Sequence, residues 1–523
     1  MPRLAEFLAI AVGCFLASAL LTWLVRGVAT RRGWLALPRV DRWHREPTAM
    51  FGGVAIYATF VAGLLVTRPL SRSLIALLLL STVMFVAGLV DDTRHLRPQP
   101  KLVVQLACGL LLYSFGYHFN EAFPWWADLF IVVFWVVAIT NAVNLLDNMN
   151  GLAAGTAVIA TVFRFLWYRE TGSIEGAMTS AVFVGAVAGF LVFNYPRASI
   201  FMGDAGSFTI GFALAALNLS SGQAYSKSLF SVFLFPVIVL AIPIFDTTFV
   251  SVVRYFSGRA ISQGGRDHMS HRLVAVGLSE SVAVLVLWSI SVVGGLDALV
   301  LYKVGFSYAW FITALLLLAF VLFGIVLERV RVYDELEVSP PAELPQTPGF
   351  LLLSEFRYKR QVLWVLVDAA TVVLSLYGAY LFLFGGGPDW ASQTARFVRV
   401  APIAVASVLI GVLITGLYRA DWQDVSMLEL SSLAQGATLG MAVTMMLFMW
   451  GPLASGEVVR GITLVLAWAA TIASMSATRV FVTALHGLLK AGATSQSAKR
   501  VTAGAYKDEE RESDVRGAKL QSR

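Results

Sequence analysis

The sequence predicts an all-α, polytopic membrane protein with about 15 transmembrane helices. Of its 523 residues, 58% are hydrophobic and only 14% are charged, and its mean hydropathy is +0.75. A soluble chain of this length would form about three domains with roughly 25% charged residues on their surfaces, so a soluble multidomain protein is excluded. Apolar runs of roughly 20 residues, each long enough to cross the hydrocarbon core, recur along the whole chain.

The apolar runs predict eleven helices, a polar interruption and then four more helices. The first eleven cover residues 4–25, 51–67, 73–90, 102–118, 127–145, 151–168, 175–193, 207–219, 228–253, 278–300 and 306–327. The last four cover residues 361–384, 397–417, 431–450 and 460–486. The first run follows Arg3 alone and stays apolar to Val25, so we expect a retained helix, even though Ala17-Ser18-Ala19 resembles a signal-peptide cleavage site.

The basic residues predict the orientation of these helices. Loops on one side of the membrane, together with the C-terminal tail, hold 28 Lys and Arg residues, whereas the other side holds nine. Cytoplasmic loops of membrane proteins carry the excess of Lys and Arg. We therefore expect the N-terminus outside, the C-terminus in the cytosol and an odd number of spans between them.

A proline-rich stretch divides the predicted helices into two domains. Residues 332–356 contain four prolines among acidic residues, which favours an extended cytosolic linker. This linker would join an eleven-helix domain over residues 1–331 to a four-helix membrane module over residues 357–488. Residues 489–523 are rich in Ala, Gly, Ser, Lys, Arg and Glu, and we expect a disordered, basic cytosolic tail there.

Cysteine usage and charge distribution exclude two other classes of protein. Cys14 and Cys108 both lie in apolar runs, and the chain has no CxxC or Cys/His metal pattern, so a disulfide framework is not expected. The net charge of +7 comes from basic residues in the loops, which fits membrane orientation better than nucleic-acid binding.

Acidic and amide side chains gather at the predicted cytosolic ends of the helices. The motifs are Asp91 and Asp92 followed by Lys101; Asn141, Asn144, Asp147 and Asn150 at every third residue; Asp204 in Gly203–Ser207; Asp246; and His268 and His271 in Arg266–Arg272. A carboxylate within the bilayer costs about 2.5–3.5 kcal/mol, so several at one face indicate a function. Oxygen ligands of this kind suit Mg²⁺ or Mn²⁺, while nearby His, Lys and Arg suit phosphate oxygens.

Each motif taken alone also has a structural interpretation. The paired acids could cap a helix, the Asn/Asp series could form interhelical hydrogen bonds, and Ser207 could begin the next helix as its N-cap. Asp246 stays open between a structural role and a role behind the site. Arg164 and Asp368, inside predicted spans, are expected to be structural. Because four separate loops bring such motifs to one membrane face, a shared site is favoured.

The order and spacing of the motifs across residues 1–330 are similar to those of one enzyme family. The motifs are His44–Gly53 (HREPTAMFGG), Gly88–Asp92 with Leu96-Arg97-Pro98 and Lys101, Asn141–Gly155 (NAVNLLDNMNGLAAG), Asn194–Gly206 (NYPRASIFMGDAG) and Asp267–Leu273 (DHMSHRL). The chain thereby resembles the polyprenyl-phosphate N-acetylhexosamine-1-phosphate transferases of glycosyltransferase family 4. The resemblance implies ten or eleven helices with a cytosolic active site in the bacterial plasma membrane.

The resemblance implies a reaction in which a UDP-N-acetylhexosamine, expected to be UDP-GlcNAc, and undecaprenyl phosphate give undecaprenyl-diphospho-sugar and UMP. Mg²⁺ or Mn²⁺ held by Asp204 and Asp147 would neutralise the diphosphate. Asp91 and Asp92 would position the acceptor phosphate or assist its proton transfer, and Lys101 would balance their charge. Because the second pKa of a phosphate is about 6, a general base is not required at pH 7.

The resemblance also implies a set of substrate contacts. Asn144 and Asp147 would line the nucleotide side, and Asn194 and Phe201 would hold the uracil. His268 and His271 would contact the diphosphate or sugar as part of the catalytic set. The other expected substrate contacts are Asn150, Arg266, His44 and Arg45. Two positions depart from the family pattern, because Asn150 stands where many relatives have Asp and Ser270 where they often have a third His.

The second predicted module has a resemblance of its own. Tyr358–Gln361 before an apolar run, and Gly416–Arg419 later, are similar to the four-helix membrane portion of polysaccharide-biosynthesis nucleotide-sugar dehydratases and epimerases. No GxGxxG motif follows a strand here, so a second enzyme is not expected. The resemblance implies a docking or scaffolding module over residues 357–488 for polysaccharide-assembly partners.

Two alternative functions were compared with the sequence. A transporter or flippase of lipid-linked sugars would use membrane acids to relay ions, but it usually has inverted repeats and acids near the bilayer midplane, and neither is evident here. A prenyl-diphosphate enzyme usually carries DDxxD, whereas Asp91 and Asp92 are followed by Arg94 and His95. Both alternatives are disfavoured.

Overall fold

The computed structural model describes residues 4–37, 47–119, 123–221, 229–256, 265, 267–304, 306–328, 330, 359–384, 390–416, 427–449, 461–484 and 487. Three predicted substrate contacts, His44, Arg45 and Arg266, lie outside the described residues. The predicted linker 332–356 and the predicted tail 489–523 lie outside them as well.

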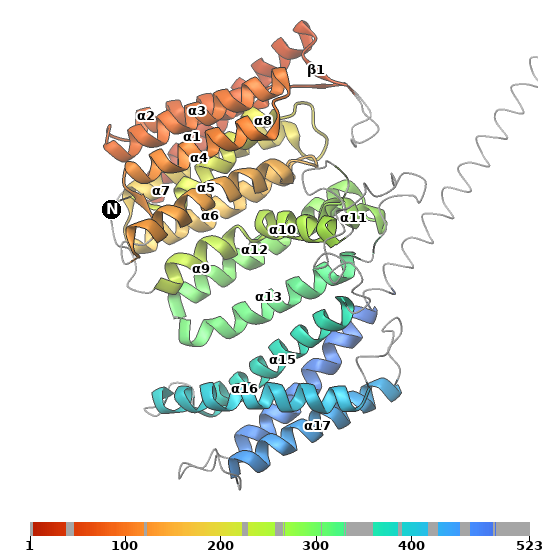
Figure 1. Cartoon of the computed structure of the whole chain (residues 1–523). Helices are drawn as coiled ribbons and strands as arrows, with labels where there is room; N and C mark the ends of the chain where they lie inside the picture. The colour runs from red at the N-terminus through yellow and green to blue at the C-terminus, as the bar shows by residue number, and fades with distance from the viewer. Residues whose placement is uncertain are drawn as a thin grey trace, which may run out of the picture. The chain divides into compact units, whose positions relative to one another are not determined.

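The described part of the chain is almost entirely helical, as predicted (Figure 1). Its first helices are α1 (Leu4–Arg32), α2 (Gly52–Thr67), α3 (Arg72–Arg94), α4 (Pro98–Ser114), α5 (Trp125–Leu146), α6 (Leu152–Thr171), α7 (Ile174–Asn194), α8 (Gly203–Leu217), α9 (Leu229–Val239), α10 (Ala241–Phe256), α11 (Met269–Ala275), α12 (Glu280–Val304) and α13 (Phe306–Glu328). Within the described ranges, eight helices are long and apolar enough to cross a membrane, and shorter apolar helices accompany them. The protein is therefore an all-α, multi-pass membrane protein.

One predicted helix is two helices in the structure. The run 228–253 is divided between α9, which ends at Val239, and α10, which begins at Ala241. Pro243 has no amide hydrogen to donate to the carbonyl of Val239, so the hydrogen-bond ladder is interrupted at this point. The short helix α11 lies within a stretch, 254–277, that was expected to be a loop.

Short strand pairs join the ends of the helices. β1 (Leu35–Ala36) pairs with β2 (Thr48–Ala49), and Ala49 also forms a parallel bridge with Ile200. These contacts connect the segments that precede α2 and α8. At the opposite ends of α4 and α8, β3 (Tyr117–His118) pairs with β4 (Ser220–Ser221). The position of α8 along the bundle is thus held from both of its ends.

The chain divides into two compact units. The first unit contains residues 1–271 and 279–309, and the second contains residues 272–278 and 310–523. In the first unit, α8 packs against α2, α3 and α5, and every residue from Ala205 to Leu217 is buried. A helix buried in this way presents its functional groups only at its ends.

The second unit contains most of α13 together with α15 (Lys359–Phe384), α16 (Trp390–Ile414), α17 (Met427–Met449) and the helix Gly461–Ala484. Its core contains an ion pair between Asp368 and Arg479, with N–O distances of 2.5 and 2.6 Å and both side chains fully buried. Leu322 and Val326 of α13 belong to this same core. The compact unit therefore starts before the predicted linker.

Candidate active site

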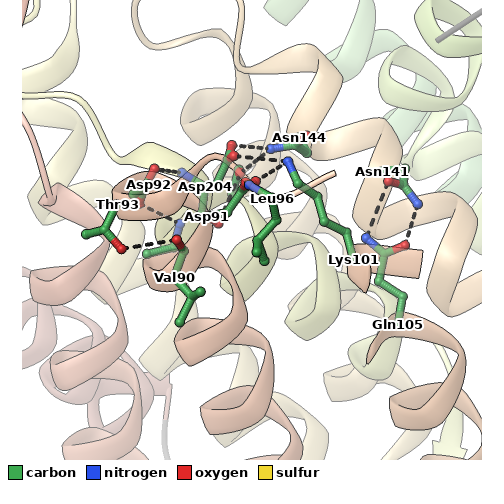
Figure 2. A network of polar contacts seen from close by, with 12 residues as sticks. Val90, Asp91, Asp92, Thr93, Leu96, Lys101, Gln105, Asn141, Asn144 and Asp204 are labelled. Atoms are coloured by element: carbon green, nitrogen blue, oxygen red, sulfur yellow. Dashed lines mark hydrogen bonds and ion pairs between the residues drawn. The ribbon is translucent and has the colours of Figure 1, made fainter. Parts of the chain in front are cut away.

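Asp204 lies in the first turn of α8 and is positioned by a carboxylate from another helix. Asp92, in the last turn of α3, accepts hydrogen bonds from the backbone N–H groups of Asp204 (2.7 Å) and Ala205 (3.0 Å) (Figure 2). The first amides of a helix have no partners within it and carry the positive end of its dipole. Asp92 therefore caps α8 and holds α3 and α8 together at this point.

Two glycines allow this close approach. Gly203 has a φ of +71°, and a Cβ atom there would lie 2.5 Å from Asp92 Oδ2. A Cβ atom on Gly88 of α3 would lie 2.3 Å from the carbonyl oxygen of Asp204. A side chain at either position would separate Asp92 from the amides that it caps.

The two carboxylate oxygens of Asp204 face different partners. Oδ1 accepts a hydrogen bond of 2.7 Å from the side-chain amide of Asn144 on α5, and Oδ2 lies 3.6 Å from Lys101 Nζ on α4. Lys101 also forms an ion pair with Asp91, whose carboxylate accepts from the backbone N–H of Leu96 at 2.7 Å. Residues from three other helices, α3, α4 and α5, thus converge on the carboxyl group of Asp204 on α8 (Figure 2).

Three carboxyl groups crowd this position. Asp204 precedes the predicted span 207–219, and partial burial raises the pKa of its carboxyl group to about 7. A hydrogen bond with Asp91 and the negative charges of Asp91 and Asp92 add to the increase, while Lys101 opposes it. Local electrostatics therefore favour a proton or an added cation at this position.

The end of α5 connects this carboxylate cluster to the His motif. Asn144 donates to Ser207 Oγ (2.8 Å) as well as to Asp204, and Asp147 is the C-cap residue that follows Leu146 at the end of α5. One residue later, the side-chain oxygen of Asn148 accepts from Ser270 Oγ at 2.7 Å. Ser270 lies between the two predicted histidines, so the two groups of site residues share one end of the first unit.

A buried aspartate orients His268. Asp246 of α10 accepts from the ring nitrogen Nδ1 of His268 at 2.7 Å and from the backbone N–H of Met269 at 2.8 Å. The carboxylate assigns the proton to Nδ1 and directs Nε2 away from Asp246. The ring of His271 lies 5.9 Å from that of His268, and both side chains are buried.

Two predicted uracil contacts make bonds within the protein. The amide of Asn194 donates to the carbonyl of Ile200 (2.9 Å) and accepts from the N–H of Gly151 (2.8 Å), and Asn194 is buried. The backbone of Phe201 bonds to Ala49 (2.9 Å) and to Gly52 (2.8 Å). The structure gives both residues a part in holding the loops before α2, α6 and α8, and their contact with uracil stays a prediction. Asn150 is half-buried in the same region.

Three contacts at the site were not anticipated from the sequence. Asn148 falls outside the three-residue repeat of the Asn/Asp series, and its bond to Ser270 depends on the packing of separate segments. The bond between Asp246 and His268 was not predicted either. The signal available in the sequence was an aspartate within an apolar run, which indicates a buried polar partner but does not identify it. Gln105, which binds Asn141, stood in an apolar run without a recognisable motif.

The described residues contain no group of three or more His, Cys, Asp or Glu side chains placed to hold a metal ion. Mg²⁺ commonly binds to one or two protein carboxylates and completes its shell with water and substrate phosphates. Asp204, with a side chain 35% exposed and a carboxyl group already hydrogen-bonded to Asp91, offers oxygen ligands of this kind. The donor set therefore fits Mg²⁺ or Mn²⁺.

Comparison with known proteins places these residues in a family. The family model described as glycosyl transferase family 4 matches residues 74–222, which include most of α3 and all of α4 to α8. A relative from Bacillus subtilis (strain 168), named "Probable undecaprenyl-phosphate N-acetylglucosaminyl 1-phosphate transferase", is 32% identical over 309 residues, covering 57% of this chain and 86% of the relative. The chain belongs to glycosyl transferase family 4.

Other curated relatives are similar to the chain as well. The decaprenyl-phosphate N-acetylglucosaminephosphotransferase of Mycolicibacterium smegmatis (strain ATCC 700084 / mc(2)155) is 30% identical, with 52% of this chain and 77% of the relative covered. The undecaprenyl-phosphate alpha-N-acetylglucosaminyl 1-phosphate transferase of Escherichia coli O157:H7 is 26% identical, with 61% and 90% covered.

Proposed function

We propose that this protein transfers N-acetylglucosamine 1-phosphate from UDP-N-acetylglucosamine to undecaprenyl phosphate and releases UMP. The names of the family relatives support the transferred group and a polyprenyl-phosphate acceptor. The observation that carries the proposal is the convergence of Asp91, Lys101 and Asn144 on the carboxyl group of Asp204. A reaction between two phosphorylated substrates needs such a set of charges and hydrogen-bond donors.

The proposed reaction forms one P–O bond and breaks another. An oxygen of the lipid phosphate attacks the phosphorus atom that carries the sugar, while the bond from this phosphorus to the bridging oxygen breaks. The bonding electron pair leaves with UMP. Because a phosphate has a second pKa of about 6, the attacking oxygen is already ionised at pH 7 and needs no dedicated base.

The side chains of this protein address the repulsion between the two substrates. Lys101 supplies a positive charge beside Asp91 and Asp204 and would stay close to the incoming phosphates. Asn144 fixes the orientation of the Asp204 carboxyl group. His268, held by Asp246, would direct Nε2 toward a diphosphate or sugar oxygen.

A magnesium ion is part of the proposal. Asp204 would hold it, with Asp147 of the same site as a second ligand, and a bound Mg²⁺ would neutralise charge on the diphosphate and on the leaving UMP. Chelation of divalent cations should therefore stop UMP release, and adding back Mg²⁺ or Mn²⁺ should restore it. The carboxyl crowding around Asp204 supports a cation at this place.

We further propose that the site faces the cytosol of a bacterial plasma membrane. The excess of Lys and Arg in the loops that carry the site motifs supports this orientation. UDP-sugars are soluble donors, so a cytosolic face suits the reaction. The four-helix module at 357–488 is proposed to dock polysaccharide-assembly partners, in keeping with its resemblance to the membrane part of other enzymes of that chemistry.

A donor screen tests the proposed function. Purified protein, undecaprenyl phosphate and Mg²⁺ are incubated with radiolabelled UDP-sugars, and lipid-linked product and UMP are measured; we expect UDP-N-acetylglucosamine to be the preferred donor.

Asp204→Asn should reduce the rate at least about 100-fold, because it removes the charge at the centre of the site. Glu170→Gln is the matched control. Glu170 is half-exposed and pairs with Lys303 near the C-terminal end of α6, whereas the site motifs lie at the N-terminal end of this helix. Wild-type rates in Asp204→Asn would refute the site.

A further inference from the structure

A reciprocal pair of amides lies directly behind the site. The side chain of Asn141 on α5 donates to Gln105 Oε1 on α4 at 2.7 Å, and Gln105 Nε2 donates back to Asn141 Oδ1 at 3.3 Å (Figure 2). Gln105 is only 1% exposed. Neither residue touches the carboxylate cluster, and neither has a role in the proposed chemistry.

The pair lies one helical turn from two site residues. Lys101 precedes Gln105 by four positions on α4, and Asn144 follows Asn141 by three positions on α5, so each pair of residues shares a helix face. Lys101 faces Oδ2 of Asp204, and Asn144 binds Oδ1. The Gln105–Asn141 pair therefore joins the same two helices that bring Lys101 and Asn144 to the two oxygens of Asp204.

The rest of the buried surface of α4 has little directional character. Apart from Gln105, the buried residues of α4 are Cys108, Gly109 and Leu112. Apolar and small residues pack well in several registers along a neighbouring membrane helix, whereas two hydrogen bonds in a low-dielectric interior allow one arrangement. Asn141 is itself held by a bond of 2.8 Å from its Nδ2 to the carbonyl of Val137.

We propose that Gln105 and Asn141 are positioning residues that fix the register of α4 against α5, so that Lys101 and Asn144 meet the two oxygens of Asp204. This inference rests on the proposed function, because the rate of the transfer reports the arrangement. The pair acts through Lys101 and Asn144 and does not contact substrate. Its loss should lower kcat more than it raises KM.

The test removes both amides together. A single substitution would leave one buried amide unpaired and destabilise the protein, whereas Gln105→Met with Asn141→Leu replaces both by apolar groups of similar shape. We expect this double variant to keep its unfolding temperature but to lose about 10- to 100-fold in kcat, the effect of a small misplacement of reacting groups, with KM values within about twofold. The exchanged pair, Gln105→Asn with Asn141→Gln, should retain at least about threefold more of kcat than the apolar pair.

A second measurement does not depend on the reaction. Lys101 has a side chain 25% exposed and is held by Asp91 and Asp204, so it should react slowly with acetic anhydride. In the apolar double variant the released Lys101 should be acetylated several times faster, as measured by mass spectrometry. Lys303, 57% exposed, is the internal control and should be acetylated equally in all variants.

A matched variant tests whether the loss of any side-chain hydrogen bond between two helices lowers kcat to the same extent. Ser375 and Ser474 hydrogen-bond at 3.0 Å between α15 and the helix Gly461–Ala484 of the second unit, and Ser375→Ala with Ser474→Ala should leave kcat unchanged. Unchanged kcat and unchanged Lys101 acetylation in the apolar double variant would overturn the inference. An equal loss of kcat in the serine variant would do the same. A wild-type protein that uses no UDP-sugar would instead refute the proposed function, and Lys101 acetylation would still decide the role of the pair.

Discussion

Asp91 and Asp92 are neighbours in the sequence, but they have different partners. Both oxygens of Asp92 accept from the first amides of α8, which holds Asp204 in place, and the contact of Asp92 with the acceptor phosphate stays a prediction. Asp91 forms an ion pair with Lys101 and a hydrogen bond with Asp204, so it lies beside the groups proposed to meet the phosphates. At the scale of single residues, two aspartates therefore differ in role because their bonding partners differ, although their side chains are the same.

Asp92→Asn should weaken the cap on α8, because one of the two accepting oxygens becomes an NH2 group, which cannot accept a hydrogen bond from a backbone N–H. We expect a loss of about 1 kcal/mol in the free energy of unfolding, together with about a tenfold lower kcat. Ser71→Ala is the control, since Ser71 caps α3 at its other end through the N–H of Leu74. Thermal unfolding and UMP release measure both effects. A lower kcat in Ser71→Ala would show that any lost cap impairs the enzyme.

Asp246→Asn should disturb His268 without disturbing the fold. We expect kcat to fall about 10- to 100-fold, the usual effect of removing a group that orients a histidine. The first unit contains a matched arrangement at its opposite end, where Asp128 accepts from His118 Nδ1 (2.8 Å) and from the N–H of Phe119 (3.0 Å). Asp128→Asn should leave kcat unchanged. Equal rates for Asp246→Asn and wild type would exclude His268 from the site.

At the scale of elements, α8 carries the site because its neighbours approach it closely. α3 reaches the start of α8 at Gly88, and the segment before α2 bonds to the segment before α8 through Ala49 and Phe201. Each contact involves backbone atoms, which allow little adjustment. The close backbone packing of these segments therefore sets the distance between Asp204 and its partners.

Gly88→Ala should push α3 away from α8. The added Cβ would lie 2.3 Å from the carbonyl oxygen of Asp204, which is backbone and cannot rotate away. We expect a destabilisation of about 1–3 kcal/mol, typical of overpacking, and a loss of most UMP release. Gly13→Ala on α1 is the control, because a Cβ there meets nothing within 4 Å. If Gly88→Ala matches Gly13→Ala in unfolding temperature and rate, the close approach is not required.

At the scale of the whole molecule, the family match covers only part of the chain, and the chain forms two compact units. The relative from Bacillus subtilis matches 57% of this chain, so a large part of the chain lies outside that match. Arg272, the residue after His271, donates to the carbonyl groups of Leu327 (3.0 Å), Glu328 (3.0 Å) and Val330 (2.9 Å) at the end of α13. The segment that begins directly after the His motif is thus bound to α13 within the second unit.

Two truncations follow from this contact. A chain that ends at residue 349 keeps the carbonyl groups bound by Arg272, and we expect its kcat to stay within about threefold of the full chain. A chain that ends at residue 304 loses them and leaves a buried Arg unsatisfied, so its kcat should fall at least about tenfold. UMP release by purified, folded protein measures both. Inactivity of the longer truncation would show that the C-terminal module is needed for catalysis.

The sequence predicted much of the fold and part of the site. The apolar runs located the helices, and Asp91, Asp92, Lys101, Asn144 and Asp204 lie together as the motifs indicated. The division of the run 228–253 at Pro243 and the existence of α11 were missed, because hydropathy does not resolve a short interruption or a helix of seven residues. The role of Asp246 was open because its partner lies in another segment.

The sequence by itself determined that this chain is an all-α membrane protein of glycosyl transferase family 4 with acidic motifs at one set of helix ends. Apolar runs must form helices in lipid, where the backbone has no other hydrogen-bond partners, so no tertiary information was needed. Only the tertiary structure decided that Asp92 caps α8, that Asp246 orients His268 and that Gln105 binds Asn141. Each of these contacts joins residues from different helices or loops, and a side chain's partner depends on how those segments pack.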